Sequence, residues 1–190
     1  SIAHLGSVVL GIFSFTEQGI SGATFTMVSH GLTTGALFAL VGMMYDRTHT
    51  RQISDYSGLM KTVPILSGAF LIASFASIGL PGFSGFVGEF LSMLGAFNTA
   101  RFYTVFAATG VIFAALYLLW AFQRSFTGEP NELATKMKDL SFRELIVVVP
   151  LLLMSLYLGL APQNMLDRVN PAVNKTTTEI NNSINAGDSK

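Results

Sequence analysis

Long apolar runs separated by short polar segments dominate the sequence. Five of these runs meet or approach the roughly 20 residues with which an α-helix crosses a hydrocarbon core of about 30 Å. They cover residues 2–15, 20–45, 63–97, 102–122 and 145–160. No ten-residue alternation typical of a membrane β-barrel is present. The pattern therefore predicts an all-α integral membrane protein with about five transmembrane helices, the fifth kinked at Pro150.

The third run, residues 63–97, is too long for one straight span and is interrupted at Leu80, Pro81 and Gly82. It is either one span with an unwound turn at membrane depth or two spans that meet in a hairpin at the surface. Loop charge separates these interpretations, because Lys and Arg accumulate in cytoplasmic loops. Residues 46–62 carry three basic residues and residues 123–144 carry four. Both loops share one face only if residues 63–97 cross once, so we expect one discontinuous helix, with these loops cytoplasmic and the C-terminal tail outside.

The composition agrees with a membrane protein and excludes several kinds of chemistry. The sequence is 51% hydrophobic and 12% charged, against about a quarter charged in soluble domains. Its formal net charge is zero and it has no basic run, so we expect no nucleic-acid partner. It has no cysteine, which excludes disulfides, thiol catalysis and cysteine-ligated clusters from this chain.

The two ends of the sequence differ in character. The chain begins at Ser1 within an apolar run that has neither a basic n-region nor a cleavage site, which predicts a chain truncated at its N-terminus. Residues 1–162 are expected to form the transmembrane part, and residues 163–190 a polar extramembrane tail. Because residues 170–190 show no apolar period, we predict that they are disordered or bound to a partner.

Glu89 is the only formally charged residue in the run of residues 63–97. A carboxylate near the bilayer centre costs about 3 to 10 kcal/mol, so such acids usually face a partner, a cavity or an ion pathway. Counting about 1.5 Å per residue from the ends of their runs places His4 and His30 at a similar depth. Because acids and histidines form proton relays in membranes, the sequence predicts a proton pathway of Glu89, His30 and His4.

Structural roles remain open for these residues. Glu89 is alternatively a structural acid at a helix contact, either protonated or hydrogen-bonded. His30 lies in the string MVSHGLTTG, which is rich in Ser, Thr and Gly, and is alternatively a hydrogen-bonding group at a close helix interface. The break at residues 80–82 is either a kink with small-residue packing or a functional hinge. His49, between Arg47 and Arg51, is expected in a solvated loop with no proton role.

Three strings resemble one family when they are taken together. In order, they are SIAHLG, VSHGLTTGALFALVGMMYDRTHTR and GLPGFSGFVGEF. They resemble the antiporter-like subunits of proton-translocating NADH:quinone oxidoreductase, respiratory complex I, and are most similar to the chain M type, which corresponds to mitochondrial subunit 4. The resemblance covers roughly residues 1–160. It implies a C-terminal fragment that holds the last five helices of a fourteen-helix subunit.

The resemblance also implies roles for single residues. The break at residues 80–82 matches the unwound centre of a discontinuous helix. Glu89 matches the last residue of a half-channel to the outer face, and His4 and His30 match histidines that link a central lysine to that acid. An acid at this place favours chain M over the sister chains L and N, which tend to carry lysine there.

By the same resemblance, the chain is a proton-translocating, non-redox subunit of a translocase in the bacterial plasma (inner) membrane. It is expected to hold no catalytic redox residue, no cofactor and no metal. NAD, FMN, iron–sulfur clusters and quinone are implied in partner subunits. The implied partners are the lipid bilayer and other complex I membrane subunits, including the sister antiporter-like chains. The alternatives are a subunit of a multi-subunit cation/proton antiporter and a structural membrane scaffold with no proton role.

Overall fold

The computed structural model describes residues 1–187, none of which lies in a strand. The elements are α1 (Ile2–Ile12), α2 (Glu17–Thr48), the 3-10 turn η1 (Ile53–Asp55), α3 (Leu59–Thr62), α4 (Pro64–Ile78), α5 (Ser84–Phe97), α6 (Arg101–Phe126), α7 (Glu132–Lys136), α8 (Phe142–Leu160) and α9 (Gln163–Gly187). Helices α2, α6 and α8 are long and apolar enough to cross a membrane, whereas α1, α4 and α5 are shorter apolar helices. The predicted all-α membrane fold is confirmed.

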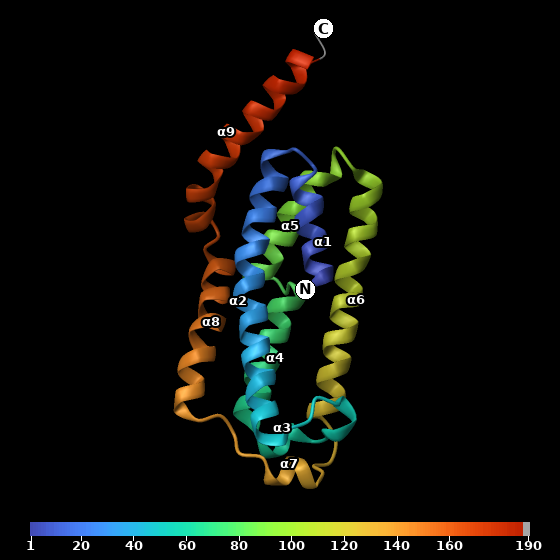
Figure 1. Cartoon of the computed structure of the whole chain (residues 1–190), viewed down its shortest axis with the longest axis vertical. Helices are drawn as coiled ribbons and strands as arrows, with labels where there is room; N and C mark the ends of the chain where they lie inside the picture. Colours follow the sequence, from blue (N-terminus) through green and yellow to red (C-terminus); the bar gives the residue numbers. More distant parts are fainter. Residues whose placement is uncertain (188–190) are drawn as a thin grey trace.

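Helix α2 forms the centre of the bundle, and α1, α4, α5 and α8 pack against it (Figure 1). It has 32 residues, which corresponds to a length of about 48 Å. The Thr16 side chain caps its start by accepting a hydrogen bond from the Gly19 amide. It ends at His49, which adopts the left-handed conformation. His49 is exposed at the end of the bundle, as expected.

The interruption of the third apolar run is present in the structure. Helix α4 ends at Ile78 and α5 begins at Ser84, so Leu80, Pro81 and Gly82 lie in the connection between them. Gly79 and Gly82 have φ angles of 81° and 105°, which residues with a side chain rarely adopt. The two half-helices follow one another in the same direction instead of turning back as a hairpin (Figure 1). The run is therefore one discontinuous helix, as predicted.

The two basic segments lie together at one end of the bundle, where α3 and α7 are neighbours (Figure 1). The amide of Gly58 donates to the Thr127 carbonyl at 3.0 Å. Lys61 pairs with Glu129 at 2.6 Å, and Asn131 donates to the carbonyl of Asp55 at 2.8 Å. The expectation that both segments share one end of the bundle is thus met.

A polar network at this end also fixes the start of α4. Arg47, in the last turn of α2, pairs with Glu144 at 2.7 Å and donates to the Lys138 carbonyl at 2.9 Å. The next residue, Asp139, accepts hydrogen bonds from the amides of Ile65 and Leu66, both at 2.9 Å. Those amides belong to the first turn of α4, which has no capping side chain of its own. The connection before α8 therefore caps the half-helix.

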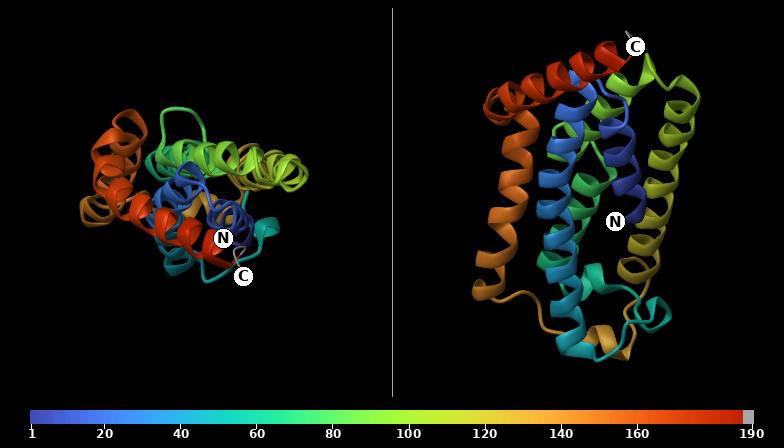
Figure 2. Two further views of the ribbon diagram at one scale, coloured as in Figure 1. Left: turned by 90° about the horizontal axis from the view of Figure 1, so that it is seen from above. Right: turned by 45° about the horizontal axis from the view of Figure 1, so that its top comes forward.

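The tail was predicted to be disordered or bound to a partner. Disorder is wrong for residues 170–187, which belong to the helix α9, and binding to a partner stays a prediction; residues 188–190 lie outside the described residues. Helix α9 crosses the end of the bundle that is opposite α7 (Figure 2). Val173 and Thr177 are buried, and Ser21 donates to Asn170 at 2.9 Å. The tail is polar on average, so its helical stripe of apolar positions was not predicted. The stripe consists of Leu166, Val169, Val173 and Ile180.

Candidate functional site

Glu89 lies on the second half-helix, five residues after its start, and is only 6% exposed. Its burial follows from the close approach of α5 and α2. At Gly88, an added Cβ would lie 2.5 Å from Thr26 Oγ1 and 2.6 Å from the Thr26 amide nitrogen. Only glycine permits this contact between the two helices. The carboxylate of the next residue is turned toward α1.

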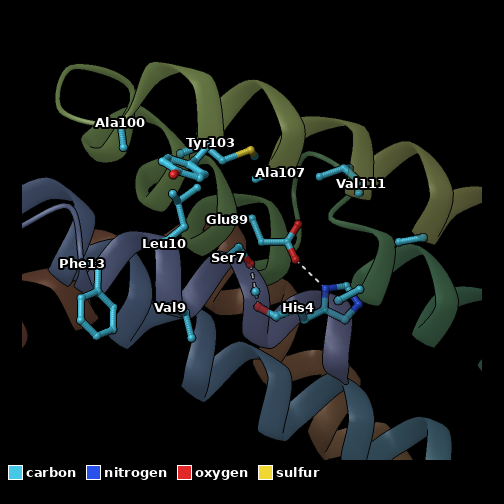
Figure 3. Close-up of a pocket in the computed structure, with 15 residues that line it drawn as sticks. His4, Ser7, Val9, Leu10, Phe13, Glu89, Ala100, Tyr103, Ala107 and Val111 are labelled. Atoms are coloured by element: carbon cyan, nitrogen blue, oxygen red, sulfur yellow. Dashed lines mark hydrogen bonds and ion pairs between the residues drawn. The ribbon is translucent and has the colours of Figure 1, made fainter.

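His4 is the direct partner of Glu89. Its Nδ1 lies 2.5 Å from Glu89 Oε1, and Figure 3 shows the carboxylate of α5 turned toward the imidazole of α1. The other ring nitrogen, Nε2, lies 3.4 Å from the hydroxyl of Ser77 on α4. The imidazole thus connects α1 with both halves of the discontinuous helix. The proton of this hydrogen bond can reside on either atom, so the donor is either the Nδ1–H of His4 or the protonated carboxyl group of Glu89.

His30 belongs to the same group but stands one step away from the acid. Its ring centroid lies 5.9 Å from that of His4, with the ring planes tilted by 52°. It is partly exposed, and its Nε2 lies 3.1 Å from the hydroxyl of Ser1. The structure therefore brings the three predicted residues together, in the spatial order His30, His4, Glu89.

A small polar cavity adjoins all three residues. Its volume is about 10 Å³, close to the minimum that one water molecule requires. The other polar residues that line it are Thr26, Ser29, Thr33 and Ser77. A single water there would have hydroxyl groups and ring nitrogens as hydrogen-bonding partners. Ser29 and Thr33 belong to the Ser-, Thr- and Gly-rich string around His30, whereas Thr26 and Ser77 were not predicted from the sequence.

A larger cavity of about 540 Å³ reaches Glu89 and His4 from the side of α6. Figure 3 shows these two polar residues on one wall and the side chains of α6, including Tyr103, Ala107 and Val111, on another. Most of this lining is apolar. The His4–Glu89 contact is therefore embedded in surroundings where electrostatic interactions are stronger than in water.

Three further serines meet beside the break. The Ser84 hydroxyl lies 2.7 Å from that of Ser29 on α2 and 2.8 Å from that of Ser155 on α8. This contact could not be predicted from the sequence, because it depends on how three separate helices pack. Within residues 1–187, no group of three or more His, Asp or Glu side chains has the arrangement of a metal site.

Comparison with known proteins places the chain in a family. The profile described as NADH:quinone oxidoreductase/Mrp antiporter, transmembrane, matches residues 1–116. The chain belongs to this family. Among its relatives, subunit M of the NADH-quinone oxidoreductase of Mycobacterium tuberculosis (strain ATCC 25618 / H37Rv) is 43% identical over 180 residues, which is 95% of this chain and 32% of the relative. The subunit M of Rickettsia prowazekii (strain Madrid E) is 46% identical over 168 residues, 88% of this chain and 34% of the relative. The chain thus spans about a third of the length of these relatives.

Two solved structures show the same arrangement of helices. A chain of respiratory complex I from Thermus thermophilus with bound NADH superposes with a TM-score of 0.87 at 36% identity, over 92% of this chain and 37% of that chain. A chain of the Mrp complex from Dietzia sp. DQ12-45-1b superposes with a TM-score of 0.80 at 22% identity, over 90% of this chain and 40% of that chain. At 22% identity, the second match shows the fold alone.

Proposed function

We propose that this chain is the C-terminal transmembrane part of subunit M of a proton-translocating NADH:quinone oxidoreductase, and that His30, His4 and Glu89 relay protons within it. The observation that carries the relay is the buried contact of 2.5 Å between His4 and Glu89 at the helix break. The similarity to subunit M of NADH-quinone oxidoreductases, at 43% and 46% identity, supports the assignment of the subunit.

In the proposed relay, protons arrive from the part of the protein that precedes this chain. They pass through His30 and His4 to Glu89, with water in the small polar cavity as a bridge. Histidine exchanges protons near neutral pH, and the acid accepts or returns a proton across a short contact. The broken helix suits this task, because unwound backbone at membrane depth needs polar neighbours or water. Glu89 then releases the proton toward the outer face.

Redox chemistry is assigned to other subunits in this proposal. Electron transfer from NADH to quinone, with FMN and iron–sulfur clusters, takes place in partner subunits, and the chain described here is a non-redox part of the translocase. Its partners are the sister antiporter-like subunits and the lipid of a bacterial plasma membrane. Residues 46–62 and 123–144 face the cytoplasm, because these two segments carry seven basic residues between them and lie together at one end of the bundle. The tail from residue 163 lies outside.

Substituting Glu89→Gln in the intact enzyme tests the relay, because glutamine keeps the shape of the side chain and removes its titration. We expect fewer protons translocated per NADH oxidised, or slower coupled turnover. The measurement is dye quenching in inverted membrane vesicles, with quinone-linked NADH oxidation followed in parallel. NADH oxidation by a soluble electron acceptor should be unchanged, because it bypasses the membrane subunits.

The matched control is Glu132→Gln, which makes the same chemical change on a side chain that is 95% exposed. This variant should pump as the unaltered enzyme does. If Glu89→Gln membranes pump fully at normal turnover, the relay is wrong. A scaffold role predicts that Glu89→Gln is silent, while Glu89→Leu lowers the amount of assembled enzyme, since leucine cannot bond to His4.

A subunit of a cation/proton antiporter is the second candidate, because the description of the family profile includes the Mrp antiporter. Such a subunit would be driven by an ion gradient rather than by electron transfer. An imposed sodium gradient without NADH separates the two functions. Proton movement in that experiment, abolished by Glu89→Gln, would favour the antiporter, and movement only with NADH favours the oxidoreductase.

A further inference from the structure

Three buried serines form a chain of hydroxyl contacts next to the helix break. Ser29, Ser84 and Ser155 are 1%, 0% and 0% exposed, and they belong to α2, α5 and α8. The Ser84 hydroxyl is the middle member, with neighbours at 2.7 and 2.8 Å. A hydroxyl has one hydrogen to donate and two lone pairs with which to accept, so Ser84 can bond to both neighbours at once.

Ser84 is also the first residue of α5, and this end of the half-helix has little else to hold it. The preceding residue, Phe83, provides no side-chain cap. This end of α5 lies partway along the bundle rather than at either of its ends (Figure 1). Helix α8 packs close to the break, because a Cβ added at Gly159 would lie 2.5 Å from the carbonyl carbon of Gly82. The serine contacts are therefore polar links from this end of α5 to the full-length helices beside it.

The direction of Glu89 depends on how α5 is turned about its own axis. Ser84 and Glu89 are five residues apart in a half-helix of 14 residues. This spacing places them about 140° apart around the axis and about 7.5 Å apart along it. Two bonds from Ser84 to different helices resist rotation of α5. Because the His4–Glu89 contact is only 2.5 Å long, a small rotation would break it.

We propose that Ser84 is a positioning residue, whose bonds to Ser29 and Ser155 fix the rotation of α5 and thereby hold the Glu89 carboxylate against His4. The inference rests on the proposed function for its effect on proton transfer. Its geometric part, the orientation of Glu89, stands independently of that function and can be measured separately.

The test substitutes Ser84→Ala in the intact membrane enzyme and compares it with Ser92→Ala. Ser92 lies on the same half-helix and is equally buried, and the structure gives its hydroxyl no hydrogen-bond partner within residues 1–187. We expect Ser84→Ala to slow coupled turnover by about tenfold, since a misplacement of about 1 Å can cost more than that. Ser92→Ala should behave as the unaltered enzyme, and Ser84→Thr, which keeps a hydroxyl, should recover most of the rate.

An infrared measurement reports the orientation of Glu89 directly. The carboxyl band of Glu89 is identified as the band that Glu89→Gln removes. It should shift in Ser84→Ala, stay in place in Ser92→Ala and return in Ser84→Thr. An unmoved band in Ser84→Ala overturns the positioning role. Normal turnover in that variant also overturns it if Glu89→Gln lowers pumping. If Ser84→Ala does not assemble, Ser155→Ala replaces it, since it leaves α5 linked to α2 only; its band should shift as well, and an unmoved band overturns the proposal.

The two hypotheses fail in different ways. If Glu89→Gln pumps normally, the proton relay is wrong, but a band that shifts in Ser84→Ala still supports the positioning of Glu89. If Glu89→Gln stops pumping while the band of Ser84→Ala stays in place, the relay is retained and the positioning role is rejected.

Discussion

The His4 imidazole uses its two nitrogens for different neighbours. Nδ1 is 2.5 Å from Glu89, whereas Nε2 is 3.4 Å from the Ser77 hydroxyl. His30 has no comparable contact with the acid and reaches the group through the His4 ring, at 5.9 Å between centroids. At the scale of single residues, the two histidines are therefore unequal, although both were predicted on the same grounds.

This inequality predicts unequal effects of substitution. His4→Gln removes the titrating partner of Glu89, and we expect coupled proton translocation to fall by about 10²-fold or more, the range typical of a lost proton-transfer group. His30→Gln should cost less, because water in the small cavity can replace a more distant group. Dye-quench assays on the two variants, normalised to the amount of assembled enzyme, give the comparison. Equal losses, or a larger loss for His30→Gln, would contradict the order of the relay.

At the scale of elements, the contact between α2 and α5 sets the position of the site. The two helices approach at Gly88, where no side chain separates them. Neither half-helix, with 15 and 14 residues, can cross a membrane alone. Helix α5 therefore depends on this close packing and on the serine contacts at its start, more than on its own length.

Gly88→Ala should disturb this packing. The new methyl group would meet the backbone of Thr26, which cannot move aside as a flexible side chain can. Overpacking of this kind typically costs about 1–3 kcal/mol, so we expect less assembled enzyme and a lower melting temperature. Gly68→Ala on α4 is the control, since a Cβ there has nothing within 4 Å. Equal stability of the two variants would show that the contact is less tight than described.

The sequence predicts some elements better than others, because some features depend on neighbouring residues and others depend on packing between helices that are distant in the sequence. The break follows from local chemistry, because Pro81 lacks an amide hydrogen and glycines permit positive φ angles. The depth of Glu89, His4 and His30 follows from the rise per residue. Counting gives no rotation about the helix axis, however, and it could not show that His4 alone touches the acid. The Ser84 contacts depend on three helices at once, and the polar composition of α9 concealed its apolar face.

At the scale of the whole molecule, the end opposite α9 is held together by interlocking polar contacts. Arg47 joins α2 to Glu144 at the start of α8 and to the backbone at Lys138. Asp139 continues this network to α4 by capping its first turn. The first half of the discontinuous helix is thus fixed at one end by Asp139 and meets the site at the other end through Ser77.

Asp139→Ala should therefore destabilise the bundle, although Asp139 lies at the end of α4 that is opposite the site. Loss of a helix cap costs about 0.5–2 kcal/mol, and we expect a lower melting temperature of the solubilised enzyme with only a minor change in proton translocation per NADH. Asp46→Ala is the matched control, because Asp46 is exposed in the last turn of α2. A melting temperature of Asp139→Ala equal to that of the control would show that the cap contributes nothing to stability.

The contact between His4 and Glu89 has a consequence for biosynthesis. His4 precedes Glu89 by 85 residues, which a bacterial ribosome adds in on the order of ten seconds. The histidine and the long helix α2 are therefore already made when the acid leaves the ribosome. The carboxylate therefore follows its partner out of the ribosome, on a half-helix of only 14 residues.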